Sequence, residues 1–213
     1  MKRIVFTIGH SNHPIQKVLS LLALHQINAV ADVRSSPFSR INPQFNRGEL
    51  QKVLNDAEVR YVFLGKELGA RSDDPACYEN DKVQYQRLAK TKQFQSGLER
   101  VIEGANSYRV ALMCAEKNPL HCHRTILVAR ELAKRGLGVM HILADGSLEA
   151  HEDCINRLLT ELGVLAEDMF LSRAQIEEAA YTKQAEKIAY VRSGHHSKSI
   201  EGISDSDQTG ADG

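Results

Sequence analysis

Short apolar segments alternate with longer amphipathic segments along most of this chain, and this alternation constrains the fold more than any other feature. Segments rich in Val, Ile, Leu and Phe predict strands at residues 3–8, 29–33, 59–64, 109–113 and 139–143. Apolar residues at helical spacing predict helices at residues 14–25, 49–57, 84–103, 125–135, 152–162 and 173–191. We therefore predict an α/β fold, a single three-layer domain with a mostly parallel sheet of about five strands, right-handed crossovers and flanking C-terminal helices.

Length and composition fit one domain. With 213 residues, of which 42% are hydrophobic and 25% charged, the chain is an ordinary globular sequence with material for one substantial core. We assign residues 1–192 to this domain. From residue 193 onward Gly, Ser, Asp and His dominate, and we predict a disordered acidic tail over residues 193–213.

The apolar segments are too short for a membrane helix or a signal peptide. We therefore expect no membrane partner and a cytoplasmic location. In that reducing compartment the four cysteines are expected to be thiols or ligands rather than a disulfide framework. They are Cys77, Cys114, Cys122 and Cys154.

Charge is unevenly distributed along the chain. The formal net charge is zero, which argues against general affinity for nucleic acid. The first 48 residues, however, carry six Lys or Arg residues and a single acid, Asp32. This part of the chain could present a local basic surface to a phosphate-bearing ligand.

Polar residues follow the predicted strands at the points where ligands bind in open parallel sheets, beyond the carboxyl ends of the strands. Gly9-His-Ser-Asn12 follows the first strand and Asp32-Val-Arg-Ser-Ser36 ends the second. Lys66 and Glu67 follow the third, and Cys114 follows the fourth. We place the functional site on these loops, centred on residues 114–124.

The segment Cys114-Ala-Glu-Lys-Asn-Pro-Leu-His-Cys-His-Arg124 carries the most chemistry. Arg124 offers a forked donor for phosphate or carboxylate, and a helix start near Cys122 would add free backbone N–H groups. Beside two histidines and Arg124, the Cys122 thiol is biased toward the thiolate, which a nucleophile requires. Cys114 by itself is better interpreted as a buried, small apolar residue.

Other chemistries for this segment stay open. The Cys-x5-Arg loop of thiol phosphatases does not fit, because Cys122 and Cys114 lie two and ten residues before Arg124. A sulfur-transfer loop would need small residues after Cys114. Zinc or iron could be held by Cys114, His121, Cys122 and His123, with His10 or Asp32 as an additional ligand. Cys114 and Cys122 would form a redox sensor if their sulfurs came within disulfide range.

Three further features have two interpretations each. His10 is a general acid or base, or a turn histidine held by the backbone. Asp32 is a catalytic carboxylate or the partner of Arg34 in an ion pair. The loop of residues 34–47 interleaves three arginines with two phenylalanines, which either contact a nucleotide or anchor a solvated loop: Arg34, Arg40, Arg47, Phe38 and Phe45.

These segments resemble a known but uncharacterised family, the domain-of-unknown-function 488 family of bacterial and archaeal proteins. The resemblance rests on Thr7-Ile-Gly-His-Ser11, on Asp32-Val-Arg-Ser-Ser-Pro37, on residues 61–71, on residues 113–124 with Cys-Ala-Glu-Lys-x-Pro-x-x-Cys-His-Arg, and on residues 179–190. It implies an α/β fold and a site built from the Gly-His-Ser, Asp-Val-Arg and Cys-His-Arg segments, and it implies no established reaction. The chain departs from the family at Ala70, where glycine is frequent.

The leading hypothesis is a thiol- or metal-dependent hydrolase or transferase that acts on a nucleotide-like or other phosphate-bearing substrate. Cys122, His10 and Asp32 are its predicted catalytic residues. The alternative is a non-catalytic module that binds nucleic acid through the loop of residues 34–47. The predicted substrate-binding residues are Arg34, Ser35, Arg71, Glu116, His123 and Arg124.

Overall fold

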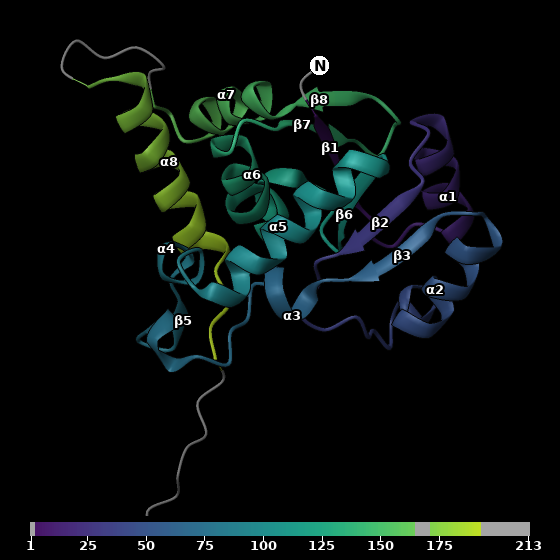
Figure 1. Ribbon diagram of the computed structural model, residues 1–213. Coiled ribbons are helices and arrows are strands. Elements are labelled where there is room, and N and C mark those ends of the chain that lie inside the picture. The colour runs from purple at the N-terminus through teal and green to yellow at the C-terminus, as the bar shows by residue number, and fades with distance from the viewer. Residues whose placement is uncertain (1–2, 165–170, 193–213) are drawn as a thin grey trace, which may run out of the picture.

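A six-stranded sheet lies at the centre of the computed structural model, which describes residues 3–164 and 171–192 (Figure 1). The strand order is β3-β2-β6-β1-β7-β8. The strands are β1 (Ile4–Gly9), β2 (Ala29–Asp32), β3 (Arg60–Phe63), β6 (Val110–Cys114), β7 (Gly138–Ile142) and β8 (Leu148–Ala150). All neighbours pair in parallel except β8, which is antiparallel to β7. The predicted α/β class and mostly parallel sheet are confirmed.

Helices cover both faces of the sheet and make the predicted three layers (Figure 1). One face packs against α1 (Ile15–Leu24) and α2 (Arg47–Asp56). The other packs against α5 (Lys92–Ser107), the π-helix η4 (Arg124–Ala129), α6 (Arg130–Lys134), α7 (His151–Glu161) and α8 (Arg173–Ile188). Neighbouring residues of β1 point to opposite faces, so Val5 joins one core and Phe6 the other.

Several predicted elements differ in detail from those observed. The predicted helix 84–103 is two helices, α4 (Tyr85–Leu88) and α5, because Thr91 begins a new helix by accepting a hydrogen bond from the backbone N–H of Phe94. The predicted helix 125–135 is divided between η4 and α6. The segment 65–80 contains α3 (Gly65–Leu68), η2 (Pro75–Cys77) and β4 (Tyr78–Glu79), which pairs with β5 (Lys82–Val83).

The loop of residues 34–47 is irregular as predicted, apart from the short η1 (Pro43–Phe45) and its last residue, Arg47, which begins α2. The predicted tail, residues 193–213, lies outside the described residues. Within the described part of the chain, no helix combines the length and the apolar character needed to cross a membrane.

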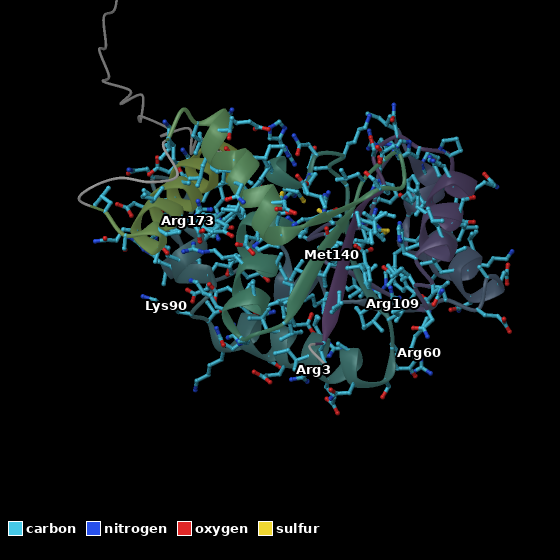
Figure 2. All side chains as sticks on the ribbon, turned by 90° about the horizontal axis from the view of Figure 1, so that it is seen from above. Arg3, Arg60, Lys90, Arg109, Met140 and Arg173 are labelled. Atoms are coloured by element: carbon cyan, nitrogen blue, oxygen red, sulfur yellow. The ribbon has the colours of Figure 1, made fainter. Side chains whose placement is uncertain are left out.

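Two of the basic residues of the N-terminal part, Arg3 and Arg34, lie at opposite ends of the strands. Arg3 precedes β1 at the amino ends of the strands, where Figure 2 also labels Arg60 and Arg109. There Arg3 donates to Asn106, and the guanidinium of Arg109 lies 4.5 Å from the centre of the Phe6 ring. Arg34, in contrast, is buried near the carboxyl ends. The sheet therefore separates charges that are close in the sequence.

A chain of buried hydrogen bonds ties the C-terminal helices to the sheet. Thr7 Oγ1 lies 2.8 Å from His141 Nδ1, and His141 Nε2 lies 3.0 Å from His151 Nδ1. His151 Nε2 lies 2.9 Å from the Tyr181 hydroxyl on α8. Because each histidine uses both ring nitrogens, the chain is continuous when both rings are neutral and each carries one hydrogen.

Acid should weaken this anchorage. Burial lowers the pKa of His151 from 6.5 to about 4 although Glu149 opposes it, and burial beside His151 also lowers the pKa of His141. Since the unfolded chain binds a proton at His151 below pH 6.5 and the folded chain does so only near pH 4, stability is lost as the pH falls between these values. The loss from His151 should reach about 3 kcal/mol.

Urea denaturation at successive pH values measures this loss as a decline in the free energy of unfolding. His151→Gln should flatten the decline, whereas the exposed His121→Gln should leave it unchanged. A decline that is equally steep in His151→Gln and in the unsubstituted protein would contradict the prediction.

Candidate functional site

The loops after β1, β2 and β6 meet at one edge of the sheet. The backbone N–H of His10 donates to the Cys114 carbonyl at 2.9 Å, and that of Val33 donates to the Met113 carbonyl at 3.1 Å. The chain leaves β1 and β2 toward α1 and α2, but it leaves β6 toward η4 on the opposite face. In open α/β sheets, ligands usually bind where the connections diverge in this way.

A short turn brings Cys122 back beside Cys114. After β6 the chain enters η3 (Pro119–His121), where the Asn118 side chain accepts a hydrogen bond from the Leu120 N–H at 3.0 Å. Cys122 follows in an extended conformation, and its carbonyl accepts the first backbone bonds of the helical segment. Cys122 therefore lies immediately before the helical segment, close to the helix start that the sequence places near it.

Cys114, Cys122 and His123 form a buried group, referred to below as the Cys/His centre. Their ligand atoms all lie within 4.8 Å of one another. His123 Nδ1 is 3.7 Å from Cys114 Sγ and 3.9 Å from Cys122 Sγ, and its Nε2 is 3.0 Å from the Val33 carbonyl oxygen. Because a carbonyl only accepts, Nε2 carries the hydrogen of the neutral ring and Nδ1 presents its lone pair to the sulfurs.

The two thiols of the centre differ in acidity. Burial raises the pKa of Cys122, but the hydrogen bond from Cys114 and the charge of Arg124 outweigh burial and hold this pKa well below its ordinary value. The same hydrogen bond, with burial, raises the pKa of Cys114. The direction for Cys122 agrees with the thiolate expected from the sequence, and Cys114, Arg124 and His123 are the groups that lower this pKa.

Arg124 is buried beside this centre, where its charge lowers the pKa of Cys122. Its side chain is among the largest that are fully buried, and within the described residues no Asp or Glu pairs with it. Nη1 donates to the Glu116 carbonyl at 2.6 Å and Nη2 to the Lys117 carbonyl at 3.3 Å. Nε is buried and has no partner in the described part of the chain. Within the described residues this buried charge therefore interacts with two carbonyl oxygens and with the Cys122 thiol, whose pKa it lowers.

Asp32 and Arg34 form a fully buried ion pair. Arg34 donates from Nε to Oδ1 at 2.9 Å and from Nη2 to Oδ2 at 2.6 Å, and its backbone N–H donates to Oδ1. The Tyr61 hydroxyl adds a fourth donor, at 2.8 Å from Oδ2. Burial opposes the charge of Arg34, but the bonds to Asp32 outweigh it and raise the Arg34 pKa. The geometry matches the ion-pair interpretation of Asp32, and a catalytic role for it stays a prediction.

His10 lies between the ion pair and the loop after β1. Its Nε2 accepts from Arg34 Nη1 at 3.2 Å, and its Nδ1 donates to the Ser11 carbonyl at 2.7 Å. The ring stacks on Phe45 with 4.1 Å between the ring centres. Burial lowers the pKa of His10 to about 4, so the ring is neutral at neutral pH. Proton transfer by His10 would require one of these hydrogen bonds to open.

The remaining predicted site residues lie farther out. Ser35 Oγ accepts from the backbone N–H of Arg71 at 3.1 Å, while the exposed Arg71 guanidinium lies over Tyr190. Glu116 is exposed and contributes its carbonyl to Arg124. His121 is exposed and is not in the Cys/His centre, although it was a predicted metal ligand.

Sequence reasoning missed the groups that hold these side chains. Tyr61 contacts Asp32 because it pairs with Val30, two residues before Asp32 on the same face of β2. The Val33 carbonyl orients His123, and the Phe45 carbonyl accepts from Arg34 at 2.9 Å. No sequence signal marks a backbone carbonyl for such a role.

The chain matches the model of a known family. A family model described as domain of unknown function DUF488 matches residues 14–130. The matched span contains the Cys/His centre, Arg124 and the Asp32–Arg34 pair, whereas residues 7–11 and 179–190 lie outside it. No curated protein matches the chain, and no solved structure matches it.

Proposed function

This chain belongs to the DUF488 family, whose model matches more than half of its 213 residues, and we propose that it is an enzyme acting on a nucleotide-like or other phosphate-bearing substrate. The description of the family names no reaction. What supports the proposal is the chemistry of the side chains at the carboxyl end of β6.

The observation that carries the proposal is the contrast between two buried arginines. Arg34 is neutralised by Asp32, whereas Arg124 has no carboxylate partner among the described residues and keeps an unused Nε–H. Within the described residues the charge of Arg124 lowers the pKa of the Cys122 thiol instead of pairing with a carboxylate, and its Nε–H remains free to bind an anionic ligand. We assign Arg124 to substrate binding and Arg34 to positioning.

The hydrogen bonds of Arg124 indicate how an anion would bind. Nη1 is held at 2.6 Å by the Glu116 carbonyl, whereas the bond from Nη2 to the Lys117 carbonyl is 3.3 Å long. A phosphate that takes Nε–H and Nη2–H side by side would displace only the longer bond. This paired geometry is the one in which arginine binds phosphate most strongly. Glu116 and Lys117 are exposed, so the loop that yields is at the surface.

The Cys/His centre supplies the reactive groups beside that anion. Cys122 precedes Arg124 by two residues and lies against His123, so a substrate held by Arg124 is brought to the sulfur. Cys122 acts there as a nucleophile or as a metal ligand, and both roles belong to hydrolases and transferases. Asp32 and His10 are bonded to Arg34 and keep the loop after β2 in place.

Arg124→Met tests the assignment by calorimetric titration with inorganic phosphate and with a nucleoside monophosphate. Loss of one charge-assisted pair should weaken phosphate binding about 10- to 150-fold. The free energy of unfolding should change by no more than about 1 kcal/mol, because removing an uncompensated charge offsets the lost hydrogen bonds. If Arg124 were only structural, the substitution would leave phosphate affinity unchanged and would lower the free energy of unfolding by more than about 1 kcal/mol.

Arg130→Met is the matched control, since Arg130 lies on the same helical segment and pairs with Glu178 away from the centre. It should leave phosphate affinity unchanged. Turnover is sought on a panel of nucleotides and sugar phosphates by chromatography of the products. Phosphate affinity that is equal in Arg124→Met and the unsubstituted protein, or no phosphate binding and no turnover at all, would overturn the proposal.

The alternative, a nucleic-acid-binding module, depends on the loop of residues 34–47. Two of the three arginines of that loop make contacts within the protein. Arg34 pairs with Asp32, and the Arg47 guanidinium lies 4.6 Å from the centre of the Phe63 ring. Arg40 and the 65% exposed Phe38 face outward. Binding of a single-stranded oligonucleotide that falls steeply with salt, survives Arg124→Met and is lost in Arg40→Ala would favour this alternative.

A further inference from the structure

We propose that Cys114, Cys122 and His123 hold one zinc ion with three protein ligands and an open fourth position. The site stands on the geometry of these side chains and does not depend on a phosphate-bearing substrate. If the proposed function also holds, the ion gives the enzyme its chemistry, because zinc activates a bound water or polarises a phosphoryl oxygen.

The distances within the Cys/His centre are those of a tetrahedral site. Zinc binds thiolate sulfur at about 2.3 Å and imidazole nitrogen at about 2.0–2.1 Å, so a tetrahedral ion separates sulfur from nitrogen by about 3.6 Å. The observed separations are 3.7 Å for Cys114 Sγ and 3.9 Å for Cys122 Sγ from His123 Nδ1. All three atoms lie within 4.8 Å of one another. Small side-chain movements would complete the coordination.

The orientation of His123 is a second, independent observation. A metal-binding histidine usually donates its other ring N–H to a carbonyl or carboxylate, which fixes the ring and directs the free lone pair at the ion. His123 does this through Nε2 and the Val33 carbonyl at 3.0 Å. Val33 follows β2, so a neighbouring strand holds the ligand in place.

Ligand type and charge favour zinc with an anionic fourth ligand. Thiolates are soft donors that suit zinc, imidazole suits zinc as well, and binding releases the thiol protons to solvent. Two thiolates cancel the charge of Zn²⁺, so the positive charge of Arg124 is left over. The guanidinium lies near the end of β1, because a Cβ added at Gly9, the partner of Cys114 in the sheet, would be 3.1 Å from Arg124 Nη1. A hydroxide or a phosphate oxygen at the fourth position of the ion would neutralise the charge of Arg124.

Cobalt is the probe that tests the site. Untagged, full-length protein is purified under reducing conditions, its metal content is measured, and the chelator-treated protein is titrated with Co²⁺. We expect about one zinc ion per chain. We also expect a thiolate-to-cobalt charge-transfer band with the visible bands of four-coordinate Co²⁺, both removed by Zn²⁺.

Matched variants assign the ligands. Cys114→Ser, Cys122→Ser and His123→Gln should each weaken Co²⁺ and Zn²⁺ binding by more than about tenfold, since even outer-sphere changes cost that much. Cys77→Ser and His121→Gln should bind like the unsubstituted protein, because Cys77 is a buried cysteine outside the centre and His121 an exposed neighbour.

Peptide-resolved alkylation decides the matter if the ligand variants do not fold. In the unsubstituted protein, Zn²⁺ should slow alkylation of Cys114 and Cys122 and leave Cys77 and Cys154 unchanged. Absence of metal and of the charge-transfer band would overturn the site. A Cys114–Cys122 disulfide in freshly reduced, zinc-free protein would also overturn it. So would a loss of metal binding in His121→Gln as large as that in the ligand variants. Calorimetry of phosphate on the zinc-free protein separates this outcome from failure of the proposed function.

Discussion

Asp32→Asn should lower the free energy of unfolding by about 3–5 kcal/mol, which would remove a large part of the stability of a domain of this kind. The Asp32 and Arg34 side chains are 0% and 6% exposed, so the substitution leaves the Arg34 charge buried and unpaired. It also turns an amide toward groups that donate hydrogen bonds, among them the Tyr61 hydroxyl. The measurement is urea denaturation at neutral pH.

A double-mutant cycle with Arg34→Met identifies the cause. If the loss comes from the unpaired charge, Asp32→Asn/Arg34→Met should be more stable than the sum of the single losses predicts, by a coupling of about 1–3 kcal/mol. Glu79→Gln is the control, because the Glu79–Arg87 pair is exposed and should contribute less than about 1 kcal/mol. Additive losses in the cycle would show that the pair is not the source.

Gly9→Ala should cost about 3–5 kcal/mol of stability and distort the candidate site at the same time. A Cβ at residue 9 would lie 1.9 Å from the Glu116 carbonyl oxygen and 3.1 Å from Arg124 Nη1. The first contact is with backbone, which cannot rotate away, so the loop held by Arg124 must move. Thermal and urea denaturation measure the stability, and phosphate titration measures the site.

Gly48→Ala is the matched control for Gly9→Ala. Gly48 lies in the first turn of α2, and a Cβ there would meet nothing within 4 Å. Replacing a helical glycine by alanine in open space should stabilise the protein by about 0.5–1 kcal/mol. If Gly9→Ala and Gly48→Ala changed the free energy of unfolding alike, close packing of the loop against Gly9 would not explain the loss in Gly9→Ala.

Local patterns predicted the sheet well and the helix boundaries less well. The five parallel strands fall where apolar, β-branched segments occur, because a strand buried on both faces needs an unbroken apolar run. The short β8 was missed, since its residues carry little apolar signal and it is defined by pairing with β7. The division of residues 84–103 at Thr91 depends on a capping bond that competes with a continuous helical period.

The candidate site shows the same division between local and tertiary information. The order of strands places the loops after β1, β2 and β6 together, so His10, Arg34 and Cys114 could be grouped from the sequence by the rule for parallel sheets. The extended conformation of Cys122 could not, because the turn of η3 and the start of η4 decide it. His121 was grouped with the site by proximity in sequence, yet it is exposed.

The sequence by itself determined the fold class, the strand positions and the set of reactive side chains, because hydrophobic periodicity and residue chemistry are local properties. Only the tertiary structure decided which partner each of these side chains has. It gave Arg34 a carboxylate and, within residues 3–164 and 171–192, left Arg124 without one, and it turned His123 toward two sulfurs by means of the Val33 carbonyl. These differences depend on which groups meet after burial, and burial sets the energetic cost of each unpaired charge.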